Sequence, residues 1–361
     1  MEVSAVSDVL IIQSHKGPYT VHFGGGPLVD IAPFSAPGTH VIIDANVARL
    51  YAEPLKAICE RPTTVVMEAF EDNKSLNAMI PLFEALVRNG VRRDHTLIAI
   101  GGGIVQDATC FVASTLLRGV PWQFVPTTLL AQADSCIGSK SSINLSGRKN
   151  ILGTFNPPTQ VFIDTAFLDT LEPKDVKSGI GEIAKVHAID GAASFDALAR
   201  DFAALETDRA VLLRYVRAAL LIKQRYIEVD EFDQGVRNIF NYGHSFGHAI
   251  ESAAHYAVPH GIAVAMGMDV ANAVSVARGL TPTLHYTRMH GCLQALYREY
   301  SSLRVSLDEV VQALMADKKN TTSALGLILP IGPDARIERQ LIERDETLLA
   351  QVRTALAGVF Q

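Results

Sequence analysis

Three histidines and one glutamate are spaced so that they could bind a metal ion. His244 and His248 lie four residues apart in YGHSFGHAIE, His260 follows in VPHG, and Glu182 precedes them in GIGEIAK. Two histidines at this spacing lie about one helical turn apart, close enough to serve one metal ion or one anionic ligand. We therefore expect a binding site here rather than a solvated surface with several histidines.

The segment that carries His244 and His248 is predicted to be an amphipathic helix. On a helical wheel of residues 242–255, one apolar stripe is formed by Phe246, Ala249, Ile250 and Ala253. The opposite side carries His244, His248, Glu251 and His255. Because the apolar stripe packs against the core, the imidazoles point elsewhere. A solvated histidine face is the alternative, and the turn Pro259-His260-Gly261, which adds another histidine, makes it less attractive.

The length of the chain predicts more than one domain. Its 361 residues exceed what a single hydrophobic core usually serves, and we predict two domains, over residues 1–170 and 171–361. The first half alternates strand-like and helical patterns, which is typical of a parallel sheet covered by helices. These patterns lie in residues 40–51, 63–72, 95–116, 122–130 and 159–168. From about Leu171 the periodicity is helical, with few strand signals before 324–332. The predicted fold is a Rossmann-like α/β domain followed by an all-helical domain.

The composition of the chain argues against some classes of binding partner. The chain has 32 Lys plus Arg against 38 Asp plus Glu, a net charge of −6, whereas nucleic-acid binding needs a basic surface. The four cysteines show no CxxC spacing, which argues against a zinc knuckle or a disulfide framework. No signal peptide and no apolar run of about 18 residues is visible. We expect a cytoplasmic protein that binds neither nucleic acid nor membranes.

A glycine-rich turn could bind a dinucleotide. Ile98-Ala99-Ile100 leads into Gly101-Gly102-Gly103, and a helix is predicted to follow. Glycines let the backbone approach a diphosphate, and a helix N-terminus offers unpaired N–H groups. An ordinary strand–helix turn is the alternative. Asp44, at the end of the strand VIID, suits either a ribose hydroxyl pair or a helix N-cap.

A polar segment over residues 126–150 is predicted to be an irregular loop. Long irregular segments commonly carry function. Lys140 and Lys149 could pair with phosphate or carboxylate, and Asn150 could orient a ligand oxygen. A solvated loop is the alternative for each of them.

Several ordered blocks of the sequence resemble the family of 3-dehydroquinate synthase and related sugar phosphate cyclases, from about Asp44 to about Ile331. The blocks are GGGIVQD (101–107), RGVPWQFVPTTLLAQADS (118–135), KNILGTFNPP (149–158), SGIGEIAK (178–185), RNIFNYGHSFGHAIE (237–251) and PHG (259–261). The resemblance implies a Rossmann-like domain, a helical domain, a cleft between them, bound NAD, one divalent metal (Zn²⁺, or Co²⁺) and a homodimer.

The resemblance also assigns residues. It implies that Glu182, His244 and His260 are the metal ligands and that His248 faces the substrate phosphate. The helical wheel alone would make His248 a metal ligand too. The positions that match NAD contacts are Asp44, Glu71, Lys74, Gly102, Gly103, Asp107, Thr127, Thr128 and Asp134. The positions that match catalytic residues are Lys140, Lys185, Lys223, Arg237, Asn241 and His248. The further substrate-binding positions are Lys149, Asn150, Lys319 (or Lys318), and Arg118, which reaches the neighbouring subunit's site.

The implied activity is that of a carbon–oxygen lyase that cyclises a sugar phosphate with elimination of phosphate and no net change of NAD. The expected substrate is 3-deoxy-arabino-heptulosonate 7-phosphate and the product 3-dehydroquinate. The chain departs from the synthase pattern at Gly138-Ser139-Lys140-Ser141, at Asn144-Leu145-Ser146 and at Asp233. The alternatives are therefore cyclases that resemble 2-deoxy-scyllo-inosose synthase, acting on glucose 6-phosphate, or 2-epi-5-epi-valiolone synthase, acting on sedoheptulose 7-phosphate. A metal-dependent alcohol or glycerol dehydrogenase of the same fold is a third.

Arg237 favours the substrate that carries a carboxylate, because guanidinium groups bind carboxylates through two parallel bonds. On a continuous helix Arg237 would lie about two turns before His244 and face the same way. The alternative is an ordinary helical ion pair with Asp233, four residues earlier.

Overall fold

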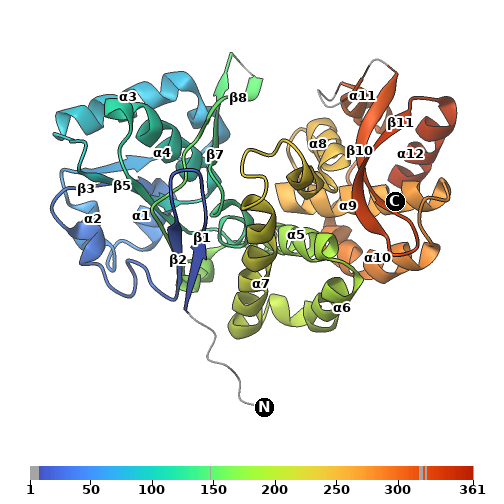
Figure 1. Cartoon of the computed structure of the whole chain (residues 1–361), viewed down its shortest axis with the longest axis horizontal. Helices are drawn as coiled ribbons and strands as arrows, with labels where there is room; N and C mark the ends of the chain where they lie inside the picture. Colours follow the sequence, from blue (N-terminus) through green and yellow to red (C-terminus); the bar gives the residue numbers. More distant parts are fainter. Residues whose placement is uncertain (1–7, 147, 317–319, 322, 361) are drawn as a thin grey trace. The chain divides into compact units, whose positions relative to one another are not determined.

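The computed structural model describes residues 8–146, 148–316, 320–321 and 323–360. They form two compact units (Figure 1). The N-terminal unit comprises Met1–Leu171 and Gln224–Phe232, and the C-terminal unit comprises Glu172–Lys223 and Asp233–Gln361. The domain boundary at residue 170 stays a prediction.

A seven-stranded sheet is the centre of the N-terminal unit, in the order β1-β2-β9-β6-β5-β3-β4. All neighbours in this sheet are parallel except β1 and β2. Its strands are β1 (Val9–Ile12), β2 (Tyr19–Phe23), β3 (Thr39–Asp44), β4 (Thr64–Met67), β5 (Thr96–Gly101), β6 (Trp122–Pro126) and β9 (Gln160–Ile163). β3 and β5 are buried over most of their length, which explains the apolar runs Val41–Ile43 and Leu97–Ile100 within them. The predicted parallel α/β architecture is confirmed.

Helices connect these strands. They are η1 (Pro33–Ser35), α1 (Ala45–Leu50), α2 (Lys56–Cys59), η2 (Glu71–Lys74), α3 (Leu76–Arg88), α4 (Gly103–Thr115), η3 (Leu116–Arg118) and η5 (Thr165–Thr170). The chain runs from β3 outward to β4 and then returns across β3 to β5. The strand order therefore reverses between β3 and β5, and open α/β sheets bind their ligands beyond the carboxyl ends of the strands at such a point.

Residues 126–150 are more regular than predicted. They contain a π-helix, η4 (Ala131–Ser135), and β7 (Lys140–Leu145), which pairs antiparallel with β8 (Arg148–Phe155). The prediction of an irregular loop was wrong because one residue on the buried side of β7 is polar. Ser141 and Ile143 are both buried while Lys140 is exposed, so the strand alternates in burial without alternating in hydrophobicity.

The C-terminal unit is mainly helical, as predicted. Its helices are α5 (Pro173–Asp190), α6 (Ala192–Asp201), η6 (Phe202–Leu205), α7 (Arg209–Ile227, whose last turn belongs to the N-terminal unit), η7 (Val236–Asn241), α8 (His244–Ala253), α9 (His260–Ala277), α10 (Thr283–Tyr297), η8 (Arg298–Tyr300), α11 (Leu307–Met315) and α12 (Glu346–Val359). The description as all-helical needs one correction. The strands β10 (Ala324–Ile331) and β11 (Arg336–Glu343) form an antiparallel hairpin.

Helix α9 is the core of the C-terminal unit. It contacts α5, α8, α10, α12 and β10. By length and composition alone α9 could cross a membrane, but 78% of it is buried inside the structure. An apolar helix covered by others on most sides is the normal core of a helical domain.

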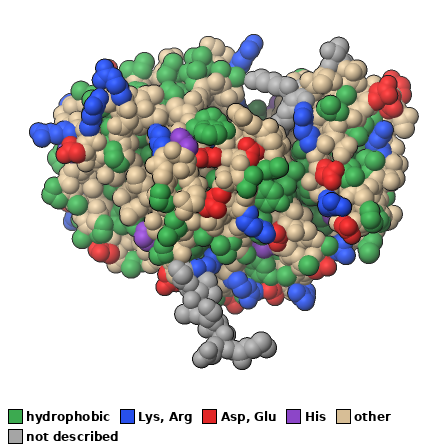
Figure 2. Space-filling model, viewed as in Figure 1, with side chains coloured by type: hydrophobic (Ala, Val, Ile, Leu, Met, Phe, Trp, Pro, Cys, Tyr) green, Lys and Arg blue, Asp and Glu red, His purple; other side chains and the backbone are tan. Residues whose placement is uncertain are grey.

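Charges of both signs are interspersed over the face of the molecule in Figure 2. No continuous basic stripe is visible among the described residues on that face. This distribution agrees with the composition, in which 32 Lys plus Arg are set against 38 Asp plus Glu.

Candidate functional site

Backbone contacts between helices position the predicted metal ligands. A Cβ added to Gly261 of α9 would lie 1.8 Å from the carbonyl oxygen of Ser178 in α5. One added to Gly267 would lie 2.0 Å from the carbonyl oxygen of Gly243, at the start of α8. These distances are far below van der Waals contact, so only glycine fits and the helix backbones touch. Both α5 and α8 are therefore held against α9 more closely than side chains would allow.

Each predicted ligand is the chain neighbour of a glycine at these two crossings. The pairs are Gly181–Glu182, Gly243–His244, Gly247–His248 and His260–Gly261. A Cβ on Gly181 would lie 2.1 Å from the carbonyl oxygen of Gly261, and one on Gly247 would lie 2.9 Å from that of Ala263. The ligand spacing is thus set by main chain rather than by adaptable side chains.

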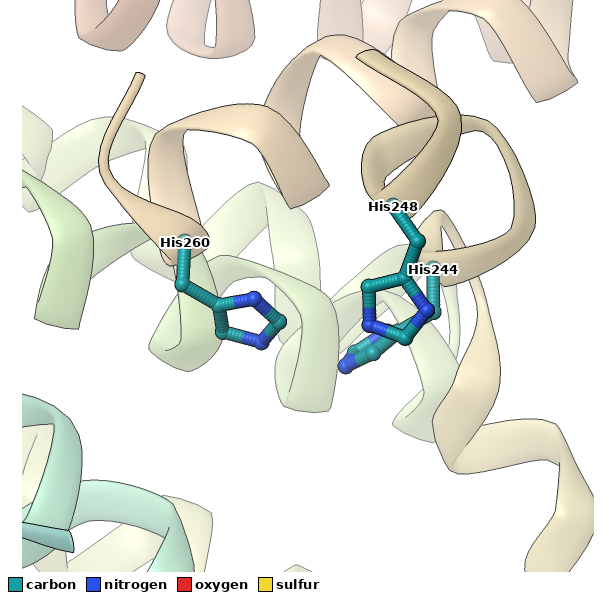
Figure 3. Close-up of side chains that lie close together, drawn as sticks. All are labelled: His244, His248 and His260. Atoms are coloured by element: carbon teal, nitrogen blue, oxygen red, sulfur yellow. The ribbon is translucent and has the colours of Figure 1, made fainter. Parts of the chain in front are cut away.

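The three histidines converge on one point (Figure 3). His244 and His248 come from α8, and His260 is the first residue of α9. One nitrogen of each ring lies within 4.8 Å of the corresponding nitrogen of the other two. This geometry agrees with the helical wheel, including its placement of His248, and the apolar stripe of α8 is buried as predicted. The three rings could share one ion.

Glu182 adds a buried carboxylate to this group. Its side chain is 1% exposed, and its Oε1 lies 3.5 Å from Nε2 of His260 and 3.9 Å from Nε2 of His244. Lys185, one turn further along α5 and also buried, forms an ion pair with it. A carboxylate is costly to bury without positive charge around it, so the position of Glu182 fits a cation centre.

Hydrogen bonds fix which ring nitrogens face Glu182. Nδ1 of His244 lies 3.2 Å from the carbonyl oxygen of Tyr242, and Nδ1 of His260 lies 3.2 Å from Oε1 of Glu251. A carbonyl and a carboxylate can only accept, so Nδ1–H donates in both rings, and in the neutral form of each ring Nε2 keeps its lone pair. An imidazole oriented through its other nitrogen is the usual arrangement of a metal ligand. The residues fit a divalent metal.

Burial and charge act differently on the two rings. Burial, with the positive charge of Lys185, holds the pKa of His244 well below its ordinary value, which keeps the ring neutral and able to ligate. Burial also lowers the pKa of His260, but the hydrogen bond to Glu251 and the charge of Glu182 outweigh it and raise the pKa above its ordinary value. His260 is thus the ring at which a proton competes most strongly with a metal.

Replacing Glu251 by Gln should weaken metal binding. Gln keeps the size but removes the charge that orients His260, and loss of such an outer partner typically costs about 10–100-fold in metal affinity. Competition with a chelator measures the affinity, and Glu343→Gln, an exposed change on β11, serves as the control. Equal affinity in both variants would rule out this role of Glu251.

The predicted substrate cations of the C-terminal unit are buried. Lys185, Lys223 and Arg237 are 2%, 6% and 7% exposed. Lys185 Nζ also lies 5.8 Å from the ring centroid of Phe240. Asn241 Nδ2 donates to the carbonyl of Asn238. A cation buried this deeply is stable only beside negative charge, which for Lys185 includes the carboxylate of Glu182.

The helical argument for Arg237 was wrong. Arg237 lies in the 3-10 helix η7, and Gly243 with φ of 78° separates it from α8. Asp233 has φ of 56° and lies outside any helix, so the pair Asp233–Arg237 does not have helical i,i+4 geometry. The burial of Arg237, rather than its helical phase, now supports a binding role.

The carboxyl ends of β3 and β5 carry the predicted dinucleotide residues of the N-terminal unit. Asp44 ends β3 and caps α1 by accepting from the N–H of Asn46 at 2.8 Å. Burial raises its pKa. Gly102 is the N-cap residue of α4 and provides no side-chain hydrogen bond to the helix, and a Cβ on Gly103 would meet open space. An uncapped helix N-terminus beside open space, at the switch point of the sheet, fits a diphosphate.

Thr127 and Thr128, which follow β6, lie at the same edge of the sheet and make hydrogen bonds there. The N–H of Thr127 donates to the carbonyl of Gly101 at 2.9 Å, which ties the end of β6 to the glycine turn. Thr128 Oγ1 accepts from the N–H of Ala131 at 3.2 Å. Asp134 follows in the π-helix η4.

A hydrogen-bond network joins further predicted residues. Lys74 Nζ lies 2.6 Å from Asp107 Oδ2 and donates to Asn150 Oδ1 at 2.9 Å. The N–H of Ser142 donates to Asp107 Oδ1 at 3.0 Å. Burial raises the pKa of Asp107, and Lys74 opposes that rise. The structure thus brings together Lys74 and Asp107, predicted for NAD, with Asn150, predicted for substrate.

Sequence reasoning missed two members of these networks. Asn144 Nδ2 donates to Glu71 Oε1 at 2.9 Å, which ties β7 to η2. Glu251 orients His260, and the helical wheel had placed it on the histidine side of α8. That position, seven residues after His244, was the signal that could have identified it.

The remaining predicted residues are exposed or lie outside the described part of the chain. Lys140 and Lys149 are exposed residues of the β7–β8 hairpin, which also carries Asn150. Arg118 is exposed, and both it and Leu117 have positive φ. Lys319 and its alternative Lys318 lie outside the described residues. The roles of all site residues stay predictions.

Comparisons with known proteins agree with the fold. Residues 64–178 match the family model 3-dehydroquinate synthase N-terminal, and residues 179–320 match 3-dehydroquinate synthase C-terminal. The chain is 35% identical to a 3-dehydroquinate synthase of Rhodospirillum rubrum over 372 residues, which covers 97% of this chain and 96% of the relative.

Two solved structures are similar. The 2-epi-5-epi-valiolone synthase of Streptomyces hygroscopicus subsp. jinggangensis, with NAD⁺ and Zn²⁺ bound, is 26% identical with a TM-score of 0.80, covering 99% of both chains. A 2-deoxy-scyllo-inosose synthase complexed with carbaglucose-6-phosphate, NAD⁺ and Co²⁺ has a TM-score of 0.81 at 22% identity, covering 96% of this chain and 99% of that one. At that identity the second likeness shows the fold alone. The predicted family is confirmed: this chain belongs to the 3-dehydroquinate synthase family of carbon–oxygen lyases.

Proposed function

We propose that this protein is a 3-dehydroquinate synthase that uses NAD and one divalent metal, Zn²⁺ or Co²⁺. It converts 3-deoxy-arabino-heptulosonate 7-phosphate to 3-dehydroquinate with release of phosphate. The observation that carries this proposal is the position of the buried Glu182 carboxylate, which faces Nε2 of His244 and Nε2 of the partly exposed His260. The relative at 35% identity over almost the whole chain supports the synthase rather than the other cyclases.

The residues of the C-terminal unit would bind metal and substrate. Glu182, His244 and His260 would hold the metal and leave a fourth position open, as catalytic zinc sites do. Lys185, Lys223 and Arg237 would neutralise a substrate that carries both a phosphate and a carboxylate.

The residues of the N-terminal unit would bind NAD. The N-terminus of α4 would receive the diphosphate and Asp44 would accept from ribose hydroxyls. When bound, the nicotinamide ring accepts and returns a hydride, and the metal supplies Lewis acidity. NAD would therefore be unchanged after each turnover.

Phosphate release tests the substrate. The enzyme loaded with NAD and Zn²⁺ should release phosphate from the heptulosonate phosphate without a lasting rise in absorbance at 340 nm. Cyclisation of glucose 6-phosphate or sedoheptulose 7-phosphate, with no reaction of the heptulosonate phosphate, would contradict the proposed substrate. The family assignment would still hold. Steady accumulation of NADH with a simple alcohol would indicate a dehydrogenase.

An Arg237→Ala variant should lose most turnover of the heptulosonate phosphate. Removing a buried cation that binds a carboxylate leaves the other charge unpaired and costs about 2–5 kcal/mol in binding or catalysis. Steady-state kinetics measures the loss, with Arg339→Ala, an exposed change on β11, as control. Metal and NAD content should stay at the wild-type level. Unchanged kinetics in Arg237→Ala would remove the argument for a carboxylate substrate.

We also propose that the protein is a cytoplasmic homodimer in which Arg118 contributes to the neighbouring subunit's site. The resemblance supports this assembly, and the exposure of Arg118 is compatible with it.

A further inference from the structure

A cavity of the C-terminal unit has features of a binding site. It measures about 410 Å³ and is bounded by the first residues of α6, the first residues of α10 and the turn between β10 and β11. We call it the α6–α10 pocket. Gly191, which lines it, comes nine residues after Glu182, or about 13 Å further along the axis of α5. The pocket is therefore separate from the proposed metal centre.

Two helix N-termini open into this pocket. α6 begins after Gly191 and α10 after Pro282, and neither N-cap residue has a side-chain hydrogen bond to the helix. The first turn of a helix has N–H groups with no partner inside the helix, and the helix dipole makes that end positive. Two such ends beside one cavity favour an anion.

A buried imidazole lines the same cavity without a hydrogen-bond partner. His285, in the first turn of α10, is 7% exposed, and neither of its ring nitrogens has a partner among the described residues. Burial, with the nearby charge of Arg288, lowers its pKa to about 4, so the ring is neutral and carries one N–H. A buried donor without an acceptor is costly and rare in native structures. A bound acceptor would satisfy it.

Charged side chains complete the lining. Arg288 and Arg336 both face the cavity. Arg288 uses its Nε for Asp196, at 3.0 Å, which leaves the terminal nitrogens of its guanidinium as further donors. Asp334, exposed in the turn, is the one acidic residue among those that line the cavity. Asp196 balances the charge of Arg288, so Arg336 and the two helix N-termini supply the positive potential that opposes Asp334.

We propose that the α6–α10 pocket binds a small metabolite through an oxyanion group, either a phosphate monoester or a carboxylate. The oxyanion accepts hydrogen bonds from His285, from Arg336 and from the first N–H groups of α6 and α10. The cavity lies within the size range of small-molecule sites, so the ligand extends beyond the oxyanion itself.

Sulfate is a suitable first probe because its charge does not change near neutral pH. Equilibrium dialysis of labelled sulfate against the enzyme loaded with NAD and Zn²⁺ should show one more site in the wild type than in Arg336→Ser. Loss of a charge-assisted hydrogen bond should weaken this site roughly tenfold or more. Arg339→Ser, on the same strand but not lining the cavity, is the matched control and should bind as the wild type does. Equal binding by wild type and Arg336→Ser would overturn the proposal.

Two further measurements make the test independent of one variant. The ring signals of His285 in an NMR spectrum of histidine-labelled protein should shift during the sulfate titration, and no shift at saturation would contradict the proposal. Asp334→Asn removes the opposing charge and should tighten sulfate binding, whereas weaker binding would contradict the proposed anion site. Competition by phosphate but not acetate would identify a phosphate ligand, and the reverse a carboxylate. None of these outcomes depends on turnover, so they are separable from the proposed synthase activity.

Discussion

A His244→Ala variant is expected to lose its bound metal and all measurable turnover. Both ligand sets, the one from the family resemblance and the one from the geometry of the three rings, contain His244. Removing a ligand should cost more than the roughly 10–100-fold expected for an outer partner. Metal analysis of the protein after dialysis measures the loss, and circular dichroism checks that the fold is kept. A stoichiometric metal content in this variant would refute the site.

His248→Ala separates the two ligand sets. If Glu182, His244 and His260 are the ligands, this variant retains its metal and loses activity through weaker substrate binding. If His248 also ligates, as the common nitrogen cluster allows, metal is lost as it is in His244→Ala. The comparison of the two variants thus decides whether His248 serves the metal or the substrate.

A Gly261→Ala variant is expected to destabilise the C-terminal unit and to empty the metal site at the same time. The new Cβ would lie 1.8 Å from a backbone carbonyl of α5, and a backbone atom cannot rotate away as a side chain can. The helices must separate, and the hydrogen bond from the N–H of Gly261 to Ser178 Oγ, 2.9 Å long, breaks. We expect a loss of about 3 kcal/mol or more in the free energy of unfolding.

Gly291→Ala is the matched control. Gly291 lies in the middle of α10, and an added Cβ there would meet nothing within 4 Å. Since alanine favours helix more than glycine does, this change should stabilise the protein by about 0.5–1 kcal/mol. Chemical denaturation of both variants gives the comparison. Equal stability of Gly261→Ala and wild type would show that the crossing adjusts without cost.

The strands and the face of α8 could be predicted from the sequence because hydrophobicity followed burial. β3 and β5 carry the apolar runs Val41–Ile43 and Leu97–Ile100, both buried. Phe246 and Ile250 lie on the buried side of α8, as the helical wheel required. The histidine cluster was predictable for the same reason, since its residues lie on the side that the apolar stripe leaves open.

Other features could not be predicted because their physical cause is not in local periodicity. The buried but polar Ser141 broke the hydrophobic alternation by which β7 could have been predicted. Gly243, with its left-handed backbone, interrupts the helix that we assumed to join Arg237 to His244. The close crossings depend on contacts between residues far apart in the chain, such as Ser178 with Gly261. A glycine beside each ligand was visible in the sequence, but nothing local distinguishes a helix-crossing glycine from a tolerated one.

The burial of α9 has a consequence for protein synthesis. The ribosome completes this apolar helix before it makes α10, β10 and α12, all of which cover it in the finished fold. At about 5–20 residues per second, the roughly 80 residues from the end of α9 to the end of α12 take on the order of 4–16 s. During that time α9 presents an apolar surface that the rest of the chain cannot yet shield. We therefore expect the nascent chain to be prone to aggregation in this interval.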